Sequence, residues 1–84
     1  MQPVIIYSSD FCPYCMRAKQ LLSRKGVAFT EIKVDGQPAL RAEMVRKAGR
    51  TSVPQIWIGA THVGGCDDLH ALERAGKLDA LLRG

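Results

Sequence analysis

The 84-residue sequence has no long apolar run, and no stretch approaches the roughly 18 apolar residues of a membrane-spanning helix. The start, Met1 to Val4, also lacks the basic and apolar regions of a secretory signal peptide. Internal repeats and low-complexity segments are absent as well. We therefore expect a cytoplasmic protein with no membrane partner.

Dense basic segments are missing too, although 12 lysine and arginine residues against 8 acidic ones give a net charge of +4. The basic residues are scattered, and no strand studded with aromatic residues accompanies them, which argues against nucleic-acid binding. A positive surface potential instead favours small anionic thiols or acidic protein partners.

Cysteine is scarce: there are three, and an odd number cannot form a fully paired disulfide framework. In a reducing compartment a close C-x-x-C pair, such as Cys12 and Cys15, is catalytic or metal-binding more often than structural. A chain of 84 residues is near the lower size at which one core is self-sufficient. We expect one domain over residues 1–84, acting as a monomer.

Hydrophobic periodicity predicts alternating strands and helices. Strand–helix–strand at the front implies a parallel crossover, and the last two strands form a hairpin. The predicted fold is α/β, a four-stranded mixed sheet (β-α-β-α-β-β-α) with helices on both faces, and its first junction carries C-x-x-C in the thioredoxin-like arrangement. Strands are predicted at 4–7, 27–34, 55–58 and 61–63, and helices at 13–25, 39–48, 66–75 and 78–82.

Cys12 and Cys15 lie at the start of the first predicted helix, where residues i and i+3 share a face about 5–6 Å apart at Cβ. A small local adjustment therefore lets a disulfide form and open. Pro13 suits the first helical position. The helix N-terminus favours negative charge, and hence the reactive thiolate of Cys12. Cys15 lies on the apolar face and is expected to be the buried, resolving thiol.

Three motifs in one order resemble the signatures of the glutaredoxin family: C-P-Y-C at 12–15, T-S-V-P at 51–54 and G-G-C-D-D at 64–68. The likeness extends from Val4 to Leu82 and is strongest to the short bacterial dithiol members. It implies a thioredoxin-like fold, with the whole of residues 1–84 as a glutaredoxin domain. It also implies glutathione as co-substrate and no permanently bound cofactor or metal.

The proline of the second motif precedes a predicted strand, so it ends a loop or sits at a sheet edge. From the residues alone an ordinary trans proline remains open. The resemblance implies that the Val53–Pro54 bond is cis and that the Val53 backbone pairs with an incoming cysteine, whose sulfur is directed at Cys12.

The third motif places two glycines before a helix N-terminus, which suits a bound carboxylate. The resemblance implies that Gly65, the backbone of Cys66 and the side chain of Asp67 hold the γ-glutamyl end of glutathione. Asp68 is expected to cap the helix, and the alternative is that both aspartates do only that. Trp57 and Phe29 are predicted to be core residues.

At the glycine end of glutathione the family commonly supplies a lysine three residues before the first cysteine, and here that position is Ser9. Arg41 matches another family position for this end, with a solvated helix charge as the alternative. Thr51, which opens the second motif, and Tyr14, expected over the sulfur, complete the implied glutathione site. His62 and His70 are interpreted as surface residues.

These residues predict a glutathione-dependent thiol-disulfide oxidoreductase in which Cys12 attacks and Cys15 resolves. Its expected substrates are protein disulfides and protein–glutathione mixed disulfides, and the resemblance suggests ribonucleotide reductase as one acceptor without singling it out. One alternative is a thioredoxin-like hydrogen donor reduced by a flavoenzyme. Another is a metal or iron–sulfur module built on Cys12, Cys15 and Cys66, although zinc ligands usually arrive as two pairs.

Overall fold

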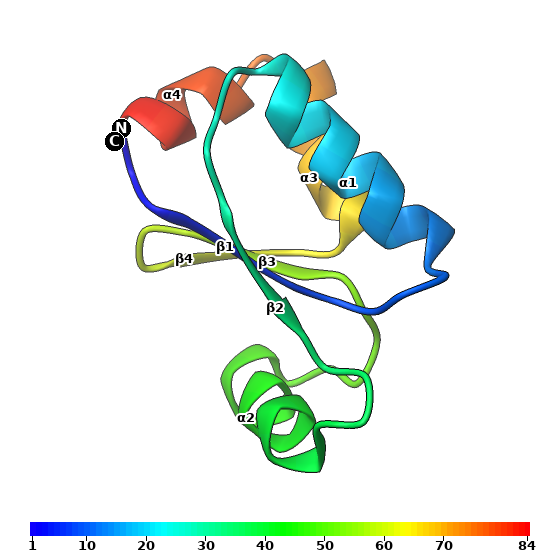
Figure 1. The fold of residues 1–84 in the computed structure, drawn as a ribbon. Helices are drawn as coiled ribbons and strands as arrows, with labels where there is room; N and C mark the ends of the chain where they lie inside the picture. The colour runs from blue at the N-terminus through cyan, green and yellow to red at the C-terminus, as the bar shows by residue number, and fades with distance from the viewer.

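The computed structural model describes all of residues 1–84 as a four-stranded sheet between helices (Figure 1). The strands lie in the order β2-β1-β3-β4 across the sheet, which confirms the predicted α/β architecture. Along the chain the elements are β1 (Val4–Ser8), α1 (Pro13–Arg24), β2 (Thr30–Lys33), α2 (Pro38–Ala48), β3 (Gln55–Ile58), β4 (Thr61–Gly64), α3 (Cys66–Arg74) and α4 (Leu78–Arg83).

The sheet is mixed, as predicted, with β1 at its centre. β1 runs parallel to β2 and antiparallel to β3, so that Ile6 lies opposite both Glu31 and Ile56. β3 and β4 form the predicted hairpin, with an irregularity in register between Ile56 and Trp57. Because parallel strands need a crossover, α1 lies between β1 and β2 in the chain. Residues 9–12 therefore leave the sheet at the carboxyl end of a central strand, where open sheets place their sites.

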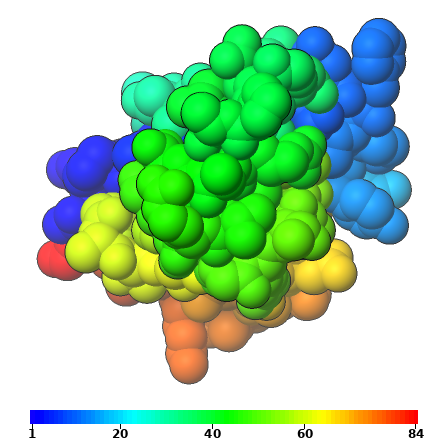
Figure 2. Space-filling view, turned by 90° about the horizontal axis from the view of Figure 1, so that it is seen from below, coloured from blue at the N-terminus to red at the C-terminus, as the bar shows by residue number.

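The two faces of the sheet are covered unequally. α1 and α3 lie side by side on one face, whereas α2 lies alone on the other, which it covers with the residues that follow it (Figures 1 and 2). The α1 side contains a core cluster of twelve buried residues, among them Ile6 and Leu69. The hydrophobic cluster on the α2 side contains only three buried residues, Tyr7, Val34 and Met44. Ile6 and Tyr7 belong to opposite clusters because successive strand residues point to opposite faces.

The second strand is shorter than predicted, since it begins at Thr30 rather than Val27 and ends at Lys33. The N–H of Val27 donates to the carbonyl of Leu22 at 3.1 Å, and Gly26 between them in the chain has a left-handed φ of 71°. The backbone of Val27 thus closes α1, while its side chain is buried in the core. Apolar periodicity reports side-chain burial and not backbone pairing, which explains the error.

The hairpin strand β4 is one residue longer than predicted because Gly64 still pairs with Ile56. Phe29 and Trp57, predicted as core residues, are half-buried and pack against the margins of the two clusters. None of the helices has the length and apolar character needed to cross a lipid bilayer.

Candidate active site

The N-terminus of α1 is capped by a sulfur atom. Cys12 is the N-cap residue, with an extended backbone, and its Sγ accepts the N–H of Cys15 at 3.2 Å. Pro13 occupies the first helical position, and the first turn contains no acidic residue. An N–H donor together with the helix dipole stabilises negative charge on this sulfur. The predicted placement of Cys12 is confirmed.

Cys15 has very different surroundings, although its sulfur is one helical turn away. Its side chain is fully buried, and it belongs to the apolar face of α1 together with Ala18, Leu21 and Leu22. Burial, followed by the hydrogen bond with Cys12, raises the pKa of the Cys15 thiol to about 12. Both cysteines are free thiols. One sulfur is therefore placed to attack, and the other stays protonated until it is needed.

The loop before β3 faces the exposed side of Cys12. The carbonyl oxygen of Val53 lies 3.9 Å from the Cys12 Sγ and accepts its S–H. The Val53–Pro54 peptide bond is cis, as the resemblance implied. Two segments that are 41 residues apart in the sequence therefore meet at the sulfur.

The N-terminus of α3 lies beside the same loop, and a carboxylate caps it. The Asp68 Oδ2 accepts the N–H of Gly65 at 2.9 Å and the Nη1–H of Arg50 at 3.0 Å. These two bonds, the backbone one first, hold the pKa of the Asp68 carboxyl below its usual range. The predicted capping role of Asp68 is confirmed. Asp67 is exposed and makes no hydrogen bond within the chain, so its carboxylate is free to meet a ligand.

Gly64, which has a φ of 113°, precedes this cap. A Cβ built at Gly64 would collide with the Asp68 carboxylate, so a side chain there would push the cap out of place. A left-handed backbone also disfavours any other residue. The first glycine of the pair is therefore required by the capping carboxylate, a role that the sequence did not suggest.

A cavity of about 220 Å³ opens between these three segments. Six of the predicted glutathione-site residues line it, whereas the predicted Arg41 and Thr51 do not. Arg50, Ser52 and the capping Asp68 line it without having been predicted as site residues; Ser52 and Asp68 belong to the second and third motifs and Arg50 directly precedes the second, which was the only signal in the sequence. The lining residues are Tyr14, Arg50, Ser52, Val53, Pro54, Gly65, Cys66, Asp67 and Asp68.

The two predicted residues outside the cavity contact each other. Arg41 is exposed, and its Nη1–H donates to the carbonyl of Thr51 at 3.4 Å. Ser9, which occupies the usual lysine position, donates its hydroxyl to Asp35, and the N–H of Asp10 donates to the same carboxylate at 2.7 Å. Both bonds lower the pKa of Asp35. The loop before Cys12 is thus tied to the residues at the end of β2 by these hydrogen bonds and by the ion pair of Lys33 with Asp10 at 2.8 Å.

Neither histidine is the surface residue that was predicted. His62 is half-buried: its ring is stacked on Trp57 at a centroid distance of 4.6 Å, and its Nε2 lies 2.8 Å from the Gln55 Oε1. The His70 Nδ1 lies 2.9 Å from the carbonyl oxygen of Cys66 and 3.4 Å from its Sγ. Hydrophobic periodicity cannot indicate the His62 contacts, because they cross strands, whereas the four-residue spacing of Cys66 and His70 in a helix was a signal for theirs. No group of three or more His, Cys, Asp or Glu side chains is arranged to hold a metal ion.

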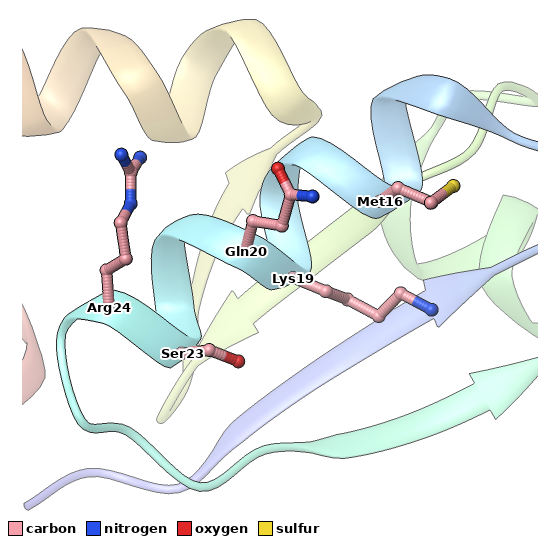
Figure 3. A pocket seen from close by; sticks show the side chains of 5 residues that line it. All are labelled: Met16, Lys19, Gln20, Ser23 and Arg24. Atoms are coloured by element: carbon pink, nitrogen blue, oxygen red, sulfur yellow. The ribbon is translucent and has the colours of Figure 1, made fainter.

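A larger depression of about 520 Å³ lies along α1, away from the thiols. Its side chains diverge, with Lys19 extending toward the strands and Arg24 toward the neighbouring helix (Figure 3). Lys19 is already paired with Glu31 at 2.8 Å. Divergent and partly neutralised groups do not form a binding site, so the smaller cavity beside Cys12 is the candidate active site.

The chain is similar to known proteins over almost its full length. The family model described as glutaredoxin matches residues 4–63. A glutaredoxin of Pseudomonas aeruginosa is 77% identical over 82 residues, which cover 98% of each chain. Glutaredoxin 3 of Escherichia coli is 58% identical over 83 residues, which cover 99% of this chain and all of that protein.

Solved structures agree with these sequence relatives. A solution structure of glutaredoxin from Brucella melitensis superposes with a TM-score of 0.87 at 61% identity, and the match covers 98% of this chain and 89% of that one. The crystal structure of a buckwheat glutaredoxin–glutathione complex gives a TM-score of 0.90 at 33% identity, covering 98% and 77%.

The site combines a thiol that is placed to attack with a buried, protonated thiol, at the carboxyl edge of a mixed sheet and beside a polar cavity. This combination is typical of one class of protein. The fold and the site are those of a thiol-disulfide oxidoreductase with a thioredoxin-like fold. The chain belongs to the glutaredoxin family. Its motifs resembled those of the short bacterial members, and the relatives from Pseudomonas aeruginosa and Escherichia coli are bacterial glutaredoxins. Glutaredoxins use glutathione as a substrate.

Proposed function

We propose that this chain is a dithiol glutaredoxin that uses glutathione to reduce protein disulfides and protein–glutathione mixed disulfides. The observation that carries the proposal is the position of Cys12: its sulfur caps α1, contacts the Val53 carbonyl at 3.9 Å and adjoins a cavity that exposes Asp67. We further propose that residues 1–84 act as one monomeric glutaredoxin domain in the cytoplasm, where glutathione keeps thiols reduced.

On a protein–glutathione mixed disulfide, the Cys12 thiolate attacks the glutathione sulfur. A Cys12–glutathione disulfide forms, and the protein thiolate leaves and takes up a proton. The thiolate of a second glutathione then attacks this disulfide at the glutathione sulfur, which releases oxidised glutathione and restores Cys12. Cys15 takes no part in this route, because its buried thiol remains protonated.

On a protein disulfide, Cys12 first forms a mixed disulfide with the substrate, and Cys15 then displaces the substrate thiol. Part of the cause of the raised Cys15 pKa is the hydrogen bond with the Cys12 sulfur. That contribution weakens once Cys12 is bonded to the substrate, so Cys15 ionises more readily at the step that needs it. Two glutathione molecules then reduce the Cys12–Cys15 disulfide and leave as oxidised glutathione.

Within the cavity, the exposed Asp67 carboxylate is proposed to accept from the ammonium of the γ-glutamyl group. The N–H groups at the start of α3, near Gly65 and Cys66, would receive its carboxylate. Tyr14 covers the tripeptide, and the Val53 backbone pairs with its cysteine. At the other end, Arg41 or the cavity-lining Arg50 supplies the cation for the glycine carboxylate.

The test is a coupled assay on a mixed disulfide of glutathione, with reduction followed through glutathione reductase in one arm and thioredoxin reductase in the other. We expect turnover only in the glutathione arm. Turnover only in the thioredoxin reductase arm would instead establish the flavoenzyme-reduced hydrogen donor.

The contact with glutathione is tested by Asp67→Asn. Loss of a hydrogen bond between charged groups costs roughly 1.5–3 kcal/mol, so we expect the KM for glutathione to rise about 10- to 100-fold. The matched control is Asp79→Asn, which removes the same charge from an exposed position near Lys25. Equal effects of the two substitutions would show that Asp67 acts through net charge alone.

A further inference from the structure

Gln55 is a fully buried amide at the point where the candidate active site joins the sheet. It is the first residue of β3, directly follows Pro54 and has no exposed surface. A buried amide without partners is costly, so the chain must supply its hydrogen bonds. It takes no part in the proposed thiol chemistry.

The partners of Gln55 determine how its amide is oriented. Its Nε2 lies 3.0 Å from the carbonyl oxygen of Ser52 and 3.4 Å from the Ser52 hydroxyl. A carbonyl only accepts, so the NH₂ of Gln55 faces Ser52 and its Oε1 faces His62. The His62 Nε2, which is 2.8 Å from that oxygen, must therefore carry a proton.

His62 is itself held in place by the sheet. Burial, assisted by the charge of Arg50, lowers the pKa of His62, with Asp68 opposing, and favours the neutral ring. The irregularity in the hairpin register places His62 opposite Trp57, on whose ring it stacks. Trp57 in turn meets Tyr7 edge to face at 5.4 Å. The Gln55 oxygen is thus anchored to rigid strand residues.

The loop from 50 to 54 needs such an anchor, because no backbone–backbone hydrogen bond holds it. Its carbonyls are instead bonded by side chains: that of Thr51 by the exposed Arg41, and that of Ser52 by the buried Gln55. An exposed arginine at 3.4 Å is a weak restraint. The buried amide is therefore the restraint on the Ser52 carbonyl, next to the residue that faces the Cys12 sulfur, while Asp68 holds the side chain of Arg50 at the start of the loop.

We propose that Gln55 is a positioning residue for glutathione: by bridging Ser52 and His62 it sets where the Val53 backbone lies relative to the Cys12 sulfur. This inference rests on the proposed function for its ligand. It assigns to His62 the role of orienting the Gln55 amide. Gln55 itself is not expected to touch glutathione, since its side chain points into the α2 face of the sheet alongside Trp57.

Two variants test the inference. Gln55→Met preserves the length of the side chain and removes its hydrogen bonds, and His62→Phe preserves the ring against Trp57 and removes the N–H donor. We expect the KM for glutathione to rise about tenfold in Gln55→Met and about threefold in His62→Phe. The alkylation rate of Cys12 should stay within about twofold, because neither variant touches the α1 cap. His62→Gln, which retains a donor, should restore part of the loss.

The controls separate positioning from lost stability. Ile58→Val shortens a buried side chain of the same strand in the cluster on the α1 side, against which no residue of the loop packs, and should leave KM unchanged. Backbone order parameters measured by NMR should fall for Thr51 to Val53 in Gln55→Met and not in Ile58→Val. If Gln55→Met does not fold, His62→Phe carries the same test alone.

The outcomes are distinct. An unchanged KM and unchanged order parameters in folded variants, with an active wild type, would overturn the positioning role and leave the proposed function intact. A wild-type protein that glutathione does not turn over would overturn the proposed function. The order parameters would then still decide whether Gln55 holds the loop.

Discussion

The N-termini of α1 and α3 adjoin the same cavity, yet they are capped in opposite ways. The sulfur of Cys12 caps α1, whose first turn has no acidic residue, whereas the carboxylate of Asp68 caps α3, whose first turn has two. Every helix N-terminus carries a partial positive charge and unpaired N–H groups. At α1 these N–H groups and this charge stabilise a reactive sulfur, whereas at α3 they hold a carboxylate that stays charged.

The difference shows how one physical effect serves two purposes. A capping atom that must react has to be released from its hydrogen bond. The Cys12 sulfur accepts a single N–H, at 3.2 Å, so only one bond has to break. A capping group that holds a loop needs more than one bond, and Asp68 binds both Gly65 and Arg50. A substitution at one cap leaves the other in place, so each cap can be tested by itself.

The largest effect is expected from removal of the α1 cap. Cys12→Ser should reduce every activity to background, because no other thiolate is placed to attack. Cys15→Ser should retain reduction of glutathione mixed disulfides and lose reduction of protein disulfides, since only the second route needs a resolving thiol. Steady-state rates on both substrate types measure this. Loss of both activities in Cys15→Ser would mean that the two thiols do not divide the work as proposed.

Removal of the α3 cap should affect stability more than chemistry. Asp68→Ala leaves the Gly65 N–H without its acceptor, and loss of an N-cap interaction costs about 1 kcal/mol in free energy of unfolding. Urea denaturation of the variant and the wild type at pH 7 measures it. The Cys12 alkylation rate should be almost unchanged, and a large change would show that the two caps are coupled.

The same cap predicts a pH dependence. Because folding lowers the pKa of Asp68, its contribution is fully present above the ordinary aspartate value of about 4 and is lost as the pH falls through the folded value. The difference in unfolding free energy between wild type and Asp68→Asn should therefore shrink below about pH 4. Urea denaturation at pH 7 and pH 3 compares the two. A difference that is the same at both values would contradict this account.

The smallest effect is expected from adding an acid to the first turns of α1. Met16→Glu puts a negative charge on an exposed position close to the Cys12 cap. Charges at helix ends are worth about 0.3–1 kcal/mol, so the thiolate reaction should slow about two- to fivefold. Gln20→Glu, one turn further along, is the matched control and should have little effect. Salt should weaken the difference, and alkylation rates at low and high ionic strength check it.

Features carried by neighbouring residues could be predicted. The pairing of Cys12 with Cys15 and the capping by Asp68 depend on contacts over three residues of helix, so spacing alone indicates them. The parallel crossover at the front and the hairpin at the back followed from the alternation of strands and helices. The extent of β2 could not be predicted, because the backbone of Val27 bonds to α1 while its side chain is buried like that of a strand residue.

Features that depend on distant segments were missed. Arg50 entered the site through Asp68, 18 residues later, and nothing near Arg50 in the sequence indicates that partner. His62 was expected at the surface, yet Trp57 and Gln55 cover it across the hairpin. Arg41 fitted a family position; it lies against Thr51 and outside the cavity, and its role toward glutathione stays a prediction.

The sequence by itself determined the order of elements and the chemical identity of the two thiols, because both follow from periodicity and from contacts within one helical turn. Only the tertiary structure decided how close the Val53 loop lies to the Cys12 sulfur, which arginine reaches the cavity and how Gln55 anchors that loop. Those choices depend on segments that are brought together when the apolar faces of the helices and the sheet are buried, and that packing acts on the whole chain at once.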